Sequence, residues 1–302
     1  NFQSVSNPND VTFTQLLGIN NSSAIAGYFG SGASGHPNKG FTLALPSTFT
    51  PENFPGSAQT QVTGINNSGN TSGFYIDTTG VTHGFMDTGG TFSTVDAPGT
   101  AFNQLLGLSD VVQAAGYSST DATGATLQRA FTEDGGSFSY LSSFLPSGIG
   151  NNQATGVNNS GEVSGFYLTN SGADATGFLL NGSKLTSLEF PGSVFTQALG
   201  LNNDGQVVGF YTDSAGNTHG FVYDVTTGTF QEVNDPLAVG PPGTTINGIN
   251  DKGQIVGFYT DAAGNVVGLV GTPTPEPASL LLMGTGLLGI FGLACLLRNQ
   301  RA

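Results

Sequence analysis

Apolar and polar residues alternate in short runs along most of this chain, and the runs end at Gly, Asn, Asp or Pro. Alternation of this kind predicts β-strands with one buried face. One twelve-residue phrase, GINNSGNTSGFY at 64–75, returns in close variants that open at Gly18, Gly107, Gly156, Gly200 and Gly248. The opening glycines are 46, 43, 49, 44 and 48 residues apart. This period with strand-like content is typical of propeller blades or another repeat array.

Each repeat predicts four strands. The first ends in Gly, an aliphatic residue and Asn, as in TQALGLN at 196–202. A turn such as Asn-Asp-Gly follows, in which Gly supplies the positive φ of a tight hairpin. The second strand resembles QVVGFY, the third carries His-Gly-Phe or a variant, and the fourth resembles GTFQEV at 228–233 and stops near a Pro. Four short antiparallel strands form one propeller blade.

The two ends of the repeat region indicate a closed ring. Residues 1–8, NFQSVSNP, resemble the fourth strand of a repeat, whereas the last repeat stops after its third strand, NVVGLVG at 265–271. An N-terminal strand that completes the last blade would remove the exposed sheet edges of an open array. We therefore predict an all-β fold, a six-bladed β-propeller over 1–271.

Two alternatives stay open at this point. A β-solenoid also repeats, but its coils are usually shorter, and a seven-bladed ring needs a repeat that the sequence lacks. The third repeat, 107–147, diverges most, since GLSDVV lacks the Asn-Gly turn and QRAF replaces HGF. We expect function where the repeats differ, especially in this repeat and in the long turn at 31–40.

The C-terminal segment has a different pattern. Residues 272–277 form a Pro-rich linker that contains Pro275, Glu276 and Pro277, and 278–297 are twenty residues without a charge, before Arg298 and Arg301. A stretch of this length can span a bilayer as a helix. Basic residues on one flank place that flank in the cytoplasm. We predict a transmembrane helix with a basic end over 278–302, with the propeller outside; a buried apolar helix is the alternative.

Composition and charge narrow the classes of function. Gly is very frequent at 47 residues and charged residues make up only 9%, as in a turn-rich β protein with a neutral polar surface. The formal net charge is −14, which repels phosphate backbones, so we expect no nucleic-acid partner. The single cysteine, Cys295, allows no intrachain disulfide. The first ten residues do not resemble a signal peptide, so we expect that an export signal was removed before residue 1.

Two resemblances follow from these motifs. Pro-Glu-Pro, an apolar helix and terminal Arg resemble the PEP-CTERM sorting signal of Gram-negative bacteria. The resemblance implies export, temporary membrane anchoring, processing by an exosortase-type protease and frequent co-occurrence with exopolysaccharide production. The body resembles the HAF-type extracellular repeat, here as GLNNDGQVVGFY with HGF at 219–221. Gly or another residue replaces the Ala of that motif, and the third, fourth and sixth repeats lack its His. Neither resemblance implies catalytic residues.

Histidines and aspartates are the first candidates for a chemical site. His83 and His219 occupy the same place in their repeats, so in a ring they lie apart, and a structural role is favoured over a metal site; His36 lies in a Gly-rich turn. Four turns place a carboxylate where calcium could bind weakly, although an Asx turn is the favoured interpretation. These calcium candidates are Asp77, Asp121, Asp213 and Asp261. No EF-hand pattern is present.

A repeated amide is the second candidate. Five glutamines and one threonine lie three residues before the opening Gly: Gln15, Gln61, Gln104, Gln153, Gln197 and Thr245. We expect them to face the central channel or to cross-link neighbouring blades, and this structural role is favoured over ligand binding. Paired carboxylates for glycoside cleavage are the sharpest enzymatic hypothesis, but each acid fits a turn or a strand edge. No nucleophilic triad, P-loop or dinucleotide motif appears.

The sequence thus predicts an exported structural or adhesive binding protein without enzymatic activity or cofactor, possible weak calcium aside. We expect it in the inner membrane first and then at the cell surface or in the biofilm matrix. A neutral extracellular polysaccharide is the expected ligand. A self-associating filament or layer subunit and a polysaccharide-active hydrolase or lyase are the alternatives.

Overall fold

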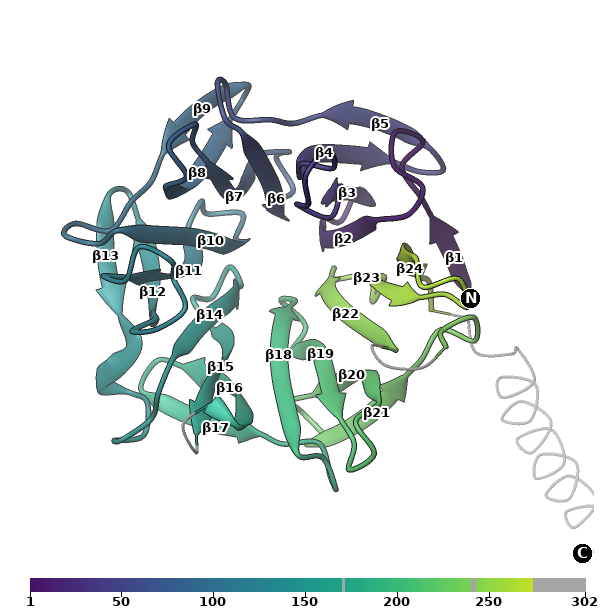
Figure 1. The fold of residues 1–302 in the computed structure, drawn as a ribbon. Helices are drawn as coiled ribbons and strands as arrows, with labels where there is room; N and C mark the ends of the chain where they lie inside the picture. Colours follow the sequence, from purple (N-terminus) through teal and green to yellow (C-terminus); the bar gives the residue numbers. More distant parts are fainter. Residues whose placement is uncertain (170–171, 240–242, 274–302) are drawn as a thin grey trace, which may run out of the picture. The chain divides into compact units, whose positions relative to one another are not determined.

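Six four-stranded antiparallel sheets surround a common axis (Figure 1). The structure, a computed structural model, describes residues 1–169, 172–239 and 243–273. We number the sheets as blades 1 to 6. The strands from the innermost to the outermost are: blade 1, β2 (Thr14–Ile19), β3 (Ala24–Phe29), β4 (Lys39–Ala44) and β5 (Thr48–Pro51); blade 2, β6 (Gln59–Ile65), β7 (Thr71–Ile76), β8 (Thr82–Thr88) and β9 (Thr91–Thr94); blade 3, β10 (Phe102–Leu108), β11 (Ala114–Ser119), β12 (Arg129–Asp134) and β13 (Ser137–Tyr140).

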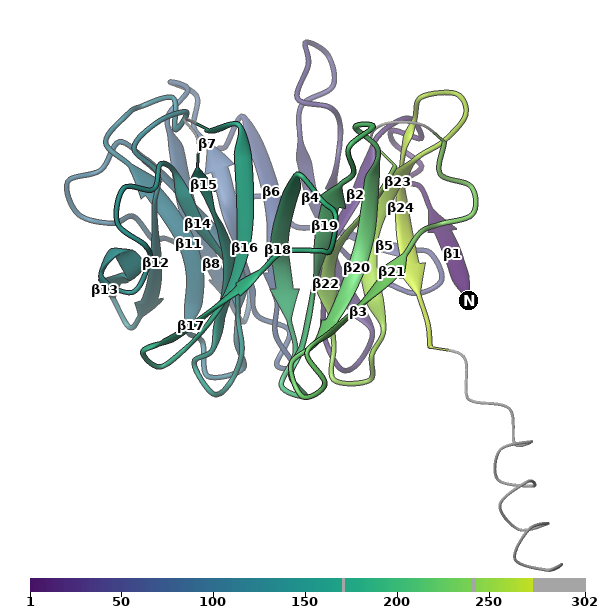
Figure 2. The same cartoon turned by 90° about the horizontal axis from the view of Figure 1, so that it is seen from below.

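Blades 4 to 6 follow the same order around the axis. Their strands are: blade 4, β14 (Asn152–Val157), β15 (Val163–Thr169), β16 (Asp174–Asn181) and β17 (Lys184–Leu188); blade 5, β18 (Phe195–Leu201), β19 (Gln206–Thr212), β20 (Thr218–Asp224) and β21 (Thr229–Val233); blade 6, β22 (Thr244–Ile249), β23 (Ile255–Thr260), β24 (Val266–Gly271) and β1 (Phe2–Val5). One 3-10 helix, η1 (Leu141–Ser143), follows β13. Seen from the side, the strands run between the two faces of the ring (Figure 2).

The N-terminal strand closes the ring. β1 pairs with β24 in antiparallel register, with Phe2 opposite Gly271 and Val5 opposite Gly268. Blade 6 is therefore built from both ends of the repeat region, and its outer edge is paired within the chain. The predicted all-β, six-bladed β-propeller is confirmed, and the solenoid and the seven-bladed ring are excluded.

The Gly of the second strand and the aromatic residue of the third strand, the Phe of His-Gly-Phe, explain how each blade packs. A large apolar residue on the third strand is almost fully buried, and it lies directly opposite a Gly on the second strand. The pairs are Phe41 with Gly27, Phe85 with Gly73, Phe131 with Gly116, Phe178 with Gly165, Phe221 with Gly209 and Leu269 with Gly257. A Cβ added to Gly73 would lie 2.8 Å from Cε1 of Phe85, so the ring occupies the space that the glycine leaves.

The opening glycine of the repeat lies on the innermost strand, at a β-bulge in every blade. There the six strands approach one another closely. A Cβ on Gly248 would lie 3.2 Å from Cα of Gly18, and one on Gly200 would lie 3.2 Å from Cα of Gly248. The glycine is thus required by the narrow axis of the ring.

Residues 274–302, which include Pro275, Glu276 and Pro277 of the linker and the predicted C-terminal helix with its basic end at 278–302, lie outside the described residues. Within the residues that are described, no helix is long and apolar enough to cross a membrane.

Candidate functional site

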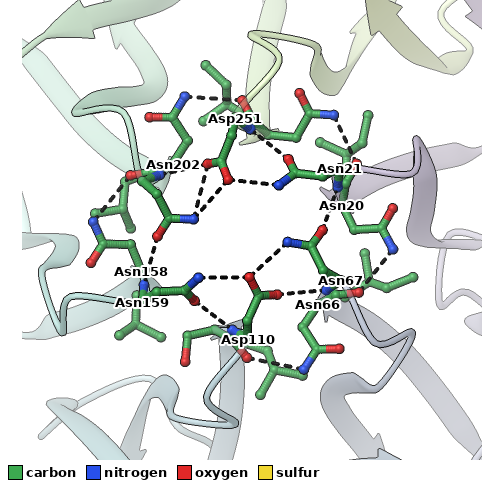
Figure 3. A pocket seen from close by; sticks show the side chains of 18 residues that line it. Asn20, Asn21, Asn66, Asn67, Asp110, Asn158, Asn159, Asn202 and Asp251 are labelled. Atoms are coloured by element: carbon green, nitrogen blue, oxygen red, sulfur yellow. Dashed lines mark hydrogen bonds between the residues drawn. The ribbon is translucent and has the colours of Figure 1, made fainter.

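The turn between the first and second strands of every blade places a polar side chain at the axis (Figure 3). These six residues, which we call the axial ring, are Asn21, Asn67, Asp110, Asn159, Asn203 and Asp251. The backbone N–H of each donates to the side-chain Oδ1 of its counterpart in the next blade, at 2.7–2.9 Å. These hydrogen bonds link each blade to the next through all six blades and return to the first. The axial ring is therefore a closed circle of hydrogen bonds between neighbouring blades.

Two aspartates organise the side-chain amides of the axial ring. Asn67 and Asn159 each donate from Nδ2 to Oδ2 of Asp110, at 2.8 Å. Asn21 and Asn203 donate in the same way to Asp251, which belongs to blade 6, opposite blade 3. Burial raises the pKa of Asp251, but hydrogen bonds from Asn21 and Asn203 outweigh it and hold that pKa below its usual range.

The residue before each member of the axial ring forms a second circle of contacts. In five blades it is a buried Asn whose Nδ2 donates to the backbone oxygen of the next blade's counterpart, at 2.9–3.2 Å. The five are Asn20, Asn66, Asn158, Asn202 and Asn250. Blade 3 has Ser109 instead, which lacks an amide, so the equivalent link from blade 3 to blade 4 is missing.

The axis leaves little room for a ligand. The cavity at the axial ring and the next one along the axis, which is lined by the opening glycines, measure about 70 Å³ each. This is room for a few water molecules. Because the oxygens of the axial ring already accept hydrogen bonds from neighbouring blades, the arrangement serves to hold the blades together. Sequence reasoning missed this role, although four repeats carry Asn-Asn at the same offset.

The predicted glutamine positions do not line either axial cavity. The hydroxyl of Tyr28 in the same blade donates to Gln15 Oε1 at 2.9 Å. Gln61 donates to Asn38 of blade 1 and Gln153 donates to Gln128 of blade 3, both at 2.9 Å, so these two link neighbouring blades. Gln104 and Gln197 are half-buried, and Thr245 is buried.

The four predicted calcium candidates lie in separate turns between second and third strands. In Asp77, Asp213 and Asp261, Oδ1 accepts the backbone N–H groups two and four residues later. In Asp121, Oδ1 accepts the N–H of Thr123 and Oδ2 accepts the N–H of Thr126, five residues later. Hydrogen bonds from the Val81 backbone and the Thr79 side chain lower the pKa of Asp77 to about 2. Those from the Asn217 side chain and backbone do the same for Asp213. In the described residues, no group of three or more His, Cys, Asp or Glu side chains could hold a metal.

The two equivalent histidines bridge acidic and amide groups of their own blades. His83 Nδ1 lies 2.6 Å from Oδ2 of Asp96, and its ring stacks on Tyr75 with centroids 5.1 Å apart. His219 Nδ1 lies 3.0 Å from Nδ2 of Asn234. These contacts tie the third strand to the segment after the fourth. His36, in the long turn at 31–40, lies 2.9 Å from Asp10.

A larger groove lies between blades 2 and 3, and we call it the blade 2–3 groove. Its volume is about 510 Å³, within the usual range of ligand sites. Met86, Val95 and Phe138 supply apolar surface, while Asp96 and Asp134 bring carboxylates. The remaining lining residues are Ser93, Thr94, Pro98, Val111, Val112, Glu133, Gly135 and Gly136.

The divergent turn of blade 3 forms one side of this groove. Val112 has φ of 65°, in the left-handed region, where four other blades place a glycine and blade 1 has Ser23. A β-branched residue there is a strained outlier, and strain of this kind concentrates at functional sites. The turn presents Val111 with 63% of its surface exposed. Two independent features, strain and exposed apolar surface, therefore coincide at the groove.

Two of the three carboxylates of the groove, Asp96 and Glu133, accept hydrogen bonds within the protein. Asp96 accepts from the backbone N–H of Gly84 at 3.1 Å as well as contacting His83. Glu133 is 4% exposed and accepts from the N–H of Gly136 at 2.5 Å. Asp134 is exposed. The groove thus offers hydrogen-bond acceptors beside an apolar surface.

Outside the propeller, one sequence comparison is informative. The model of the PEP-CTERM protein-sorting motif matches residues 273–298. This chain carries a PEP-CTERM motif. The PEP-CTERM motif marks an exported protein that is anchored at the membrane by its C-terminus before processing of the exosortase type. No curated protein matches the sequence.

Solved structures of similar fold share little sequence with this chain. TolB from Acinetobacter baumannii aligns with a TM-score of 0.54 at 10% identity, covering 84% of this chain and 65% of that one, less than two thirds of TolB. A putative TolB from Agrobacterium tumefaciens gives 0.55 at 13% identity, with 91% of both chains covered. A triple arginine-to-alanine mutant of AofleA from Arthrobotrys oligospora gives 0.53 at 11%, covering 89% and 86%. At these identities the likeness shows the fold alone.

Proposed function

We propose that this exported propeller is a non-enzymatic binding protein that takes a neutral carbohydrate chain in the blade 2–3 groove. The observation that carries the proposal is the groove itself, at about 510 Å³, beside the strained and exposed turn of blade 3. The axial cavities are about 70 Å³ each, and their polar groups are occupied in joining blades.

Charge favours a neutral ligand. The propeller carries only four basic side chains, Lys39, Arg129, Lys184 and Lys252, and none of them lines the groove. An anionic polymer would meet Asp96 and Asp134 without a compensating cation. The hydroxyls of a neutral sugar can donate to such carboxylates, while the apolar face of the sugar packs on Val111 and Phe138.

The proposed setting is the cell surface or the extracellular matrix. The sorting motif supports export and release by an exosortase-type protease, and a matrix polysaccharide is the proposed partner there. The HAF-type label remains a resemblance of the repeats, which supports an extracellular role.

Glycan binding by the soluble fragment 1–273 tests this proposal. The fragment contains all strands of the closed ring, because β1 pairs with β24. We expect a neutral oligosaccharide or polysaccharide to bind. The double variant Val111→Ser with Val112→Gly introduces the Ser-Gly of the turns in blades 2 and 4, and we expect it to weaken binding at least tenfold. Ser160→Ala, at the place of Val111 in blade 4, is the matched control and should bind like the parent. Equal binding by the double variant, or no neutral glycan bound, overturns the proposal.

The same samples distinguish the two alternatives. Asp96, Glu133 and Asp134 line one groove, which is the observation that favours a polysaccharide-active enzyme. Release of reducing ends from a bound polysaccharide would identify such an enzyme and refute the non-enzymatic role. Concentration-dependent assembly in sedimentation experiments, without glycan binding, would support a self-associating subunit instead.

A further inference from the structure

The contact between blades 1 and 2 holds three polar residues at positions that are mostly apolar at the other blade contacts. Three positions meet at each contact. They are the residue at the end of the fourth strand or directly after it, the residue two before the glycine that faces the buried apolar residue in the next blade's second strand, and the residue two after that buried residue in the third strand. Between blades 6 and 1 these positions hold Val5, Ile25 and Leu43, which share one buried cluster. Between blades 1 and 2 they hold Glu52, Thr71 and Asp87.

The repeats make this exception specific. The first two positions are apolar at every other contact. They hold Val95 and Ala114, Leu141 and Val163, Leu188 and Val207, and Val233 and Ile255. The third position is also polar between blades 2 and 3, where it holds Glu133. Only the contact between blades 1 and 2 has a polar residue at all three positions.

The three polar side chains face one another. Thr71 and Asp87 are directly opposite on β7 and β8, and the hydroxyl of Thr71 donates to Oε1 of Glu52 at 2.9 Å. Asp87 is only 8% exposed, and its Oδ1 has no hydrogen-bond partner among the described residues. Such an orphaned carboxylate oxygen is costly in a buried site.

Two carboxylates meet here without a basic partner. Neither Glu52 nor Asp87 takes part in the ion pairs found among the described residues. Burial and the Asp87 carboxyl group, against the opposing hydrogen bond from Thr71, raise the pKa of Glu52 to about 7. A shared proton or a bound cation would neutralise the pair and give the unpaired Oδ1 of Asp87 a partner.

We propose that Glu52, Asp87 and Thr71 form a calcium site at the contact between blades 1 and 2. The donors are all oxygen atoms, which suit a hard divalent cation, and Ca²⁺ tolerates irregular geometry. Glu52 is only partly buried, so water can complete the coordination from the solvent side. With few protein ligands, the affinity falls in the roughly 10⁻⁴–10⁻³ M range of extracellular calcium modules. The site is distinct from the four acidic turns, whose carboxylates already bind their own backbone.

Calcium titration of the 1–273 fragment at pH 7.5 tests the site. We expect Ca²⁺ at about ten times its dissociation constant to raise Tm by roughly 2–5 °C, and calorimetry to show one site. The triple variant Glu52→Val, Thr71→Ile, Asp87→Leu reproduces the contact between blades 6 and 1, so it should fold and lose the calcium response. Glu52→Gln is the second variant: its amide can donate to Asp87 without a cation, and the calcium response should also disappear.

Asp213→Asn is the matched control, since it removes an acidic turn and should keep the response. A parent fragment whose Tm does not respond to Ca²⁺ overturns the proposal and leaves a proton as the occupant. A response that persists in both Glu52→Gln and the triple variant also overturns it, because calcium would then bind elsewhere. Neither result bears on glycan binding in the blade 2–3 groove.

Discussion

The missing amide of blade 3 leads to a prediction of gained stability. In five blades, the buried Asn before the axial ring donates to the next blade at 2.9–3.2 Å. Its Oδ1 also accepts two backbone N–H groups of its own turn, as Asn66 does at 3.0 and 3.1 Å. The side-chain hydroxyl of Ser109 accepts only the backbone N–H of Gln113, at 3.1 Å. Ser109→Asn should therefore add two hydrogen bonds, one within the turn and one to the backbone oxygen of Asn158.

The expected gain follows from the usual net value of a hydrogen bond. At about 0.5–1.5 kcal/mol each, two bonds contribute about 1–3 kcal/mol to the free energy of unfolding. For a domain of this size, 1 kcal/mol moves Tm by roughly 2–4 °C, so an increase of at least about 2 °C is expected. The reciprocal change, Asn66→Ser, copies blade 3 into blade 2 and should lower the free energy of unfolding by a similar amount.

Urea unfolding of the 1–273 fragment measures both variants. The chain has no Trp and 8 Tyr, so far-UV circular dichroism and tyrosine fluorescence are suitable signals. The slope with urea should stay unchanged, since neither variant alters the surface exposed on unfolding. If Ser109→Asn leaves the midpoint unchanged or lowers it while Asn66→Ser is destabilising, the strained Val112 turn holds blade 3 out of register and our reasoning is wrong.

Three further predictions concern the ring as a whole. Gly165→Ala places a Cβ against the backbone oxygen of Gln153 and should lower the free energy of unfolding in urea by more than about 2 kcal/mol. Gly150→Ala, whose Cβ would have its nearest neighbour at 3.5 Å, is the control and should lower it by less than about 1 kcal/mol. Because the pKa of Asp213 is lowered to about 2, the stabilisation by this carboxylate is present above about pH 4 and is lost as the pH falls through about 2. The difference in Tm between the parent and Asp213→Asn should therefore shrink over that range. A constant difference would contradict the stabilising role of the ionised carboxylate. Deletion of residues 1–5 exposes the edge of β24 and should give an unstable or aggregating fragment; a monomeric product with the parent's Tm would show that closure is dispensable.

Much of the architecture could be predicted from the sequence, because the repeat constrains each blade in the same way. The fourth-strand resemblance of the N-terminus correctly predicted that β1 completes blade 6. The site was harder to predict. The roles of the glutamines depend on which blade each side chain reaches, as Gln61 reaches Asn38 of the preceding blade. The divergence of the third repeat did indicate where the groove lies, since Val111 and Val112 replace the usual turn.

The sequence alone determined the number of blades, the order of strands and the turn chemistry, since these depend on local alternation and on Gly, Asn and Pro. Only the tertiary structure decided what the repeated asparagines do, because their hydrogen bonds join residues more than 40 positions apart in neighbouring blades. The same holds for Glu52 and Asp87. Each is an ordinary polar residue in its own strand, and they become a buried acidic pair only when blades 1 and 2 pack against one another.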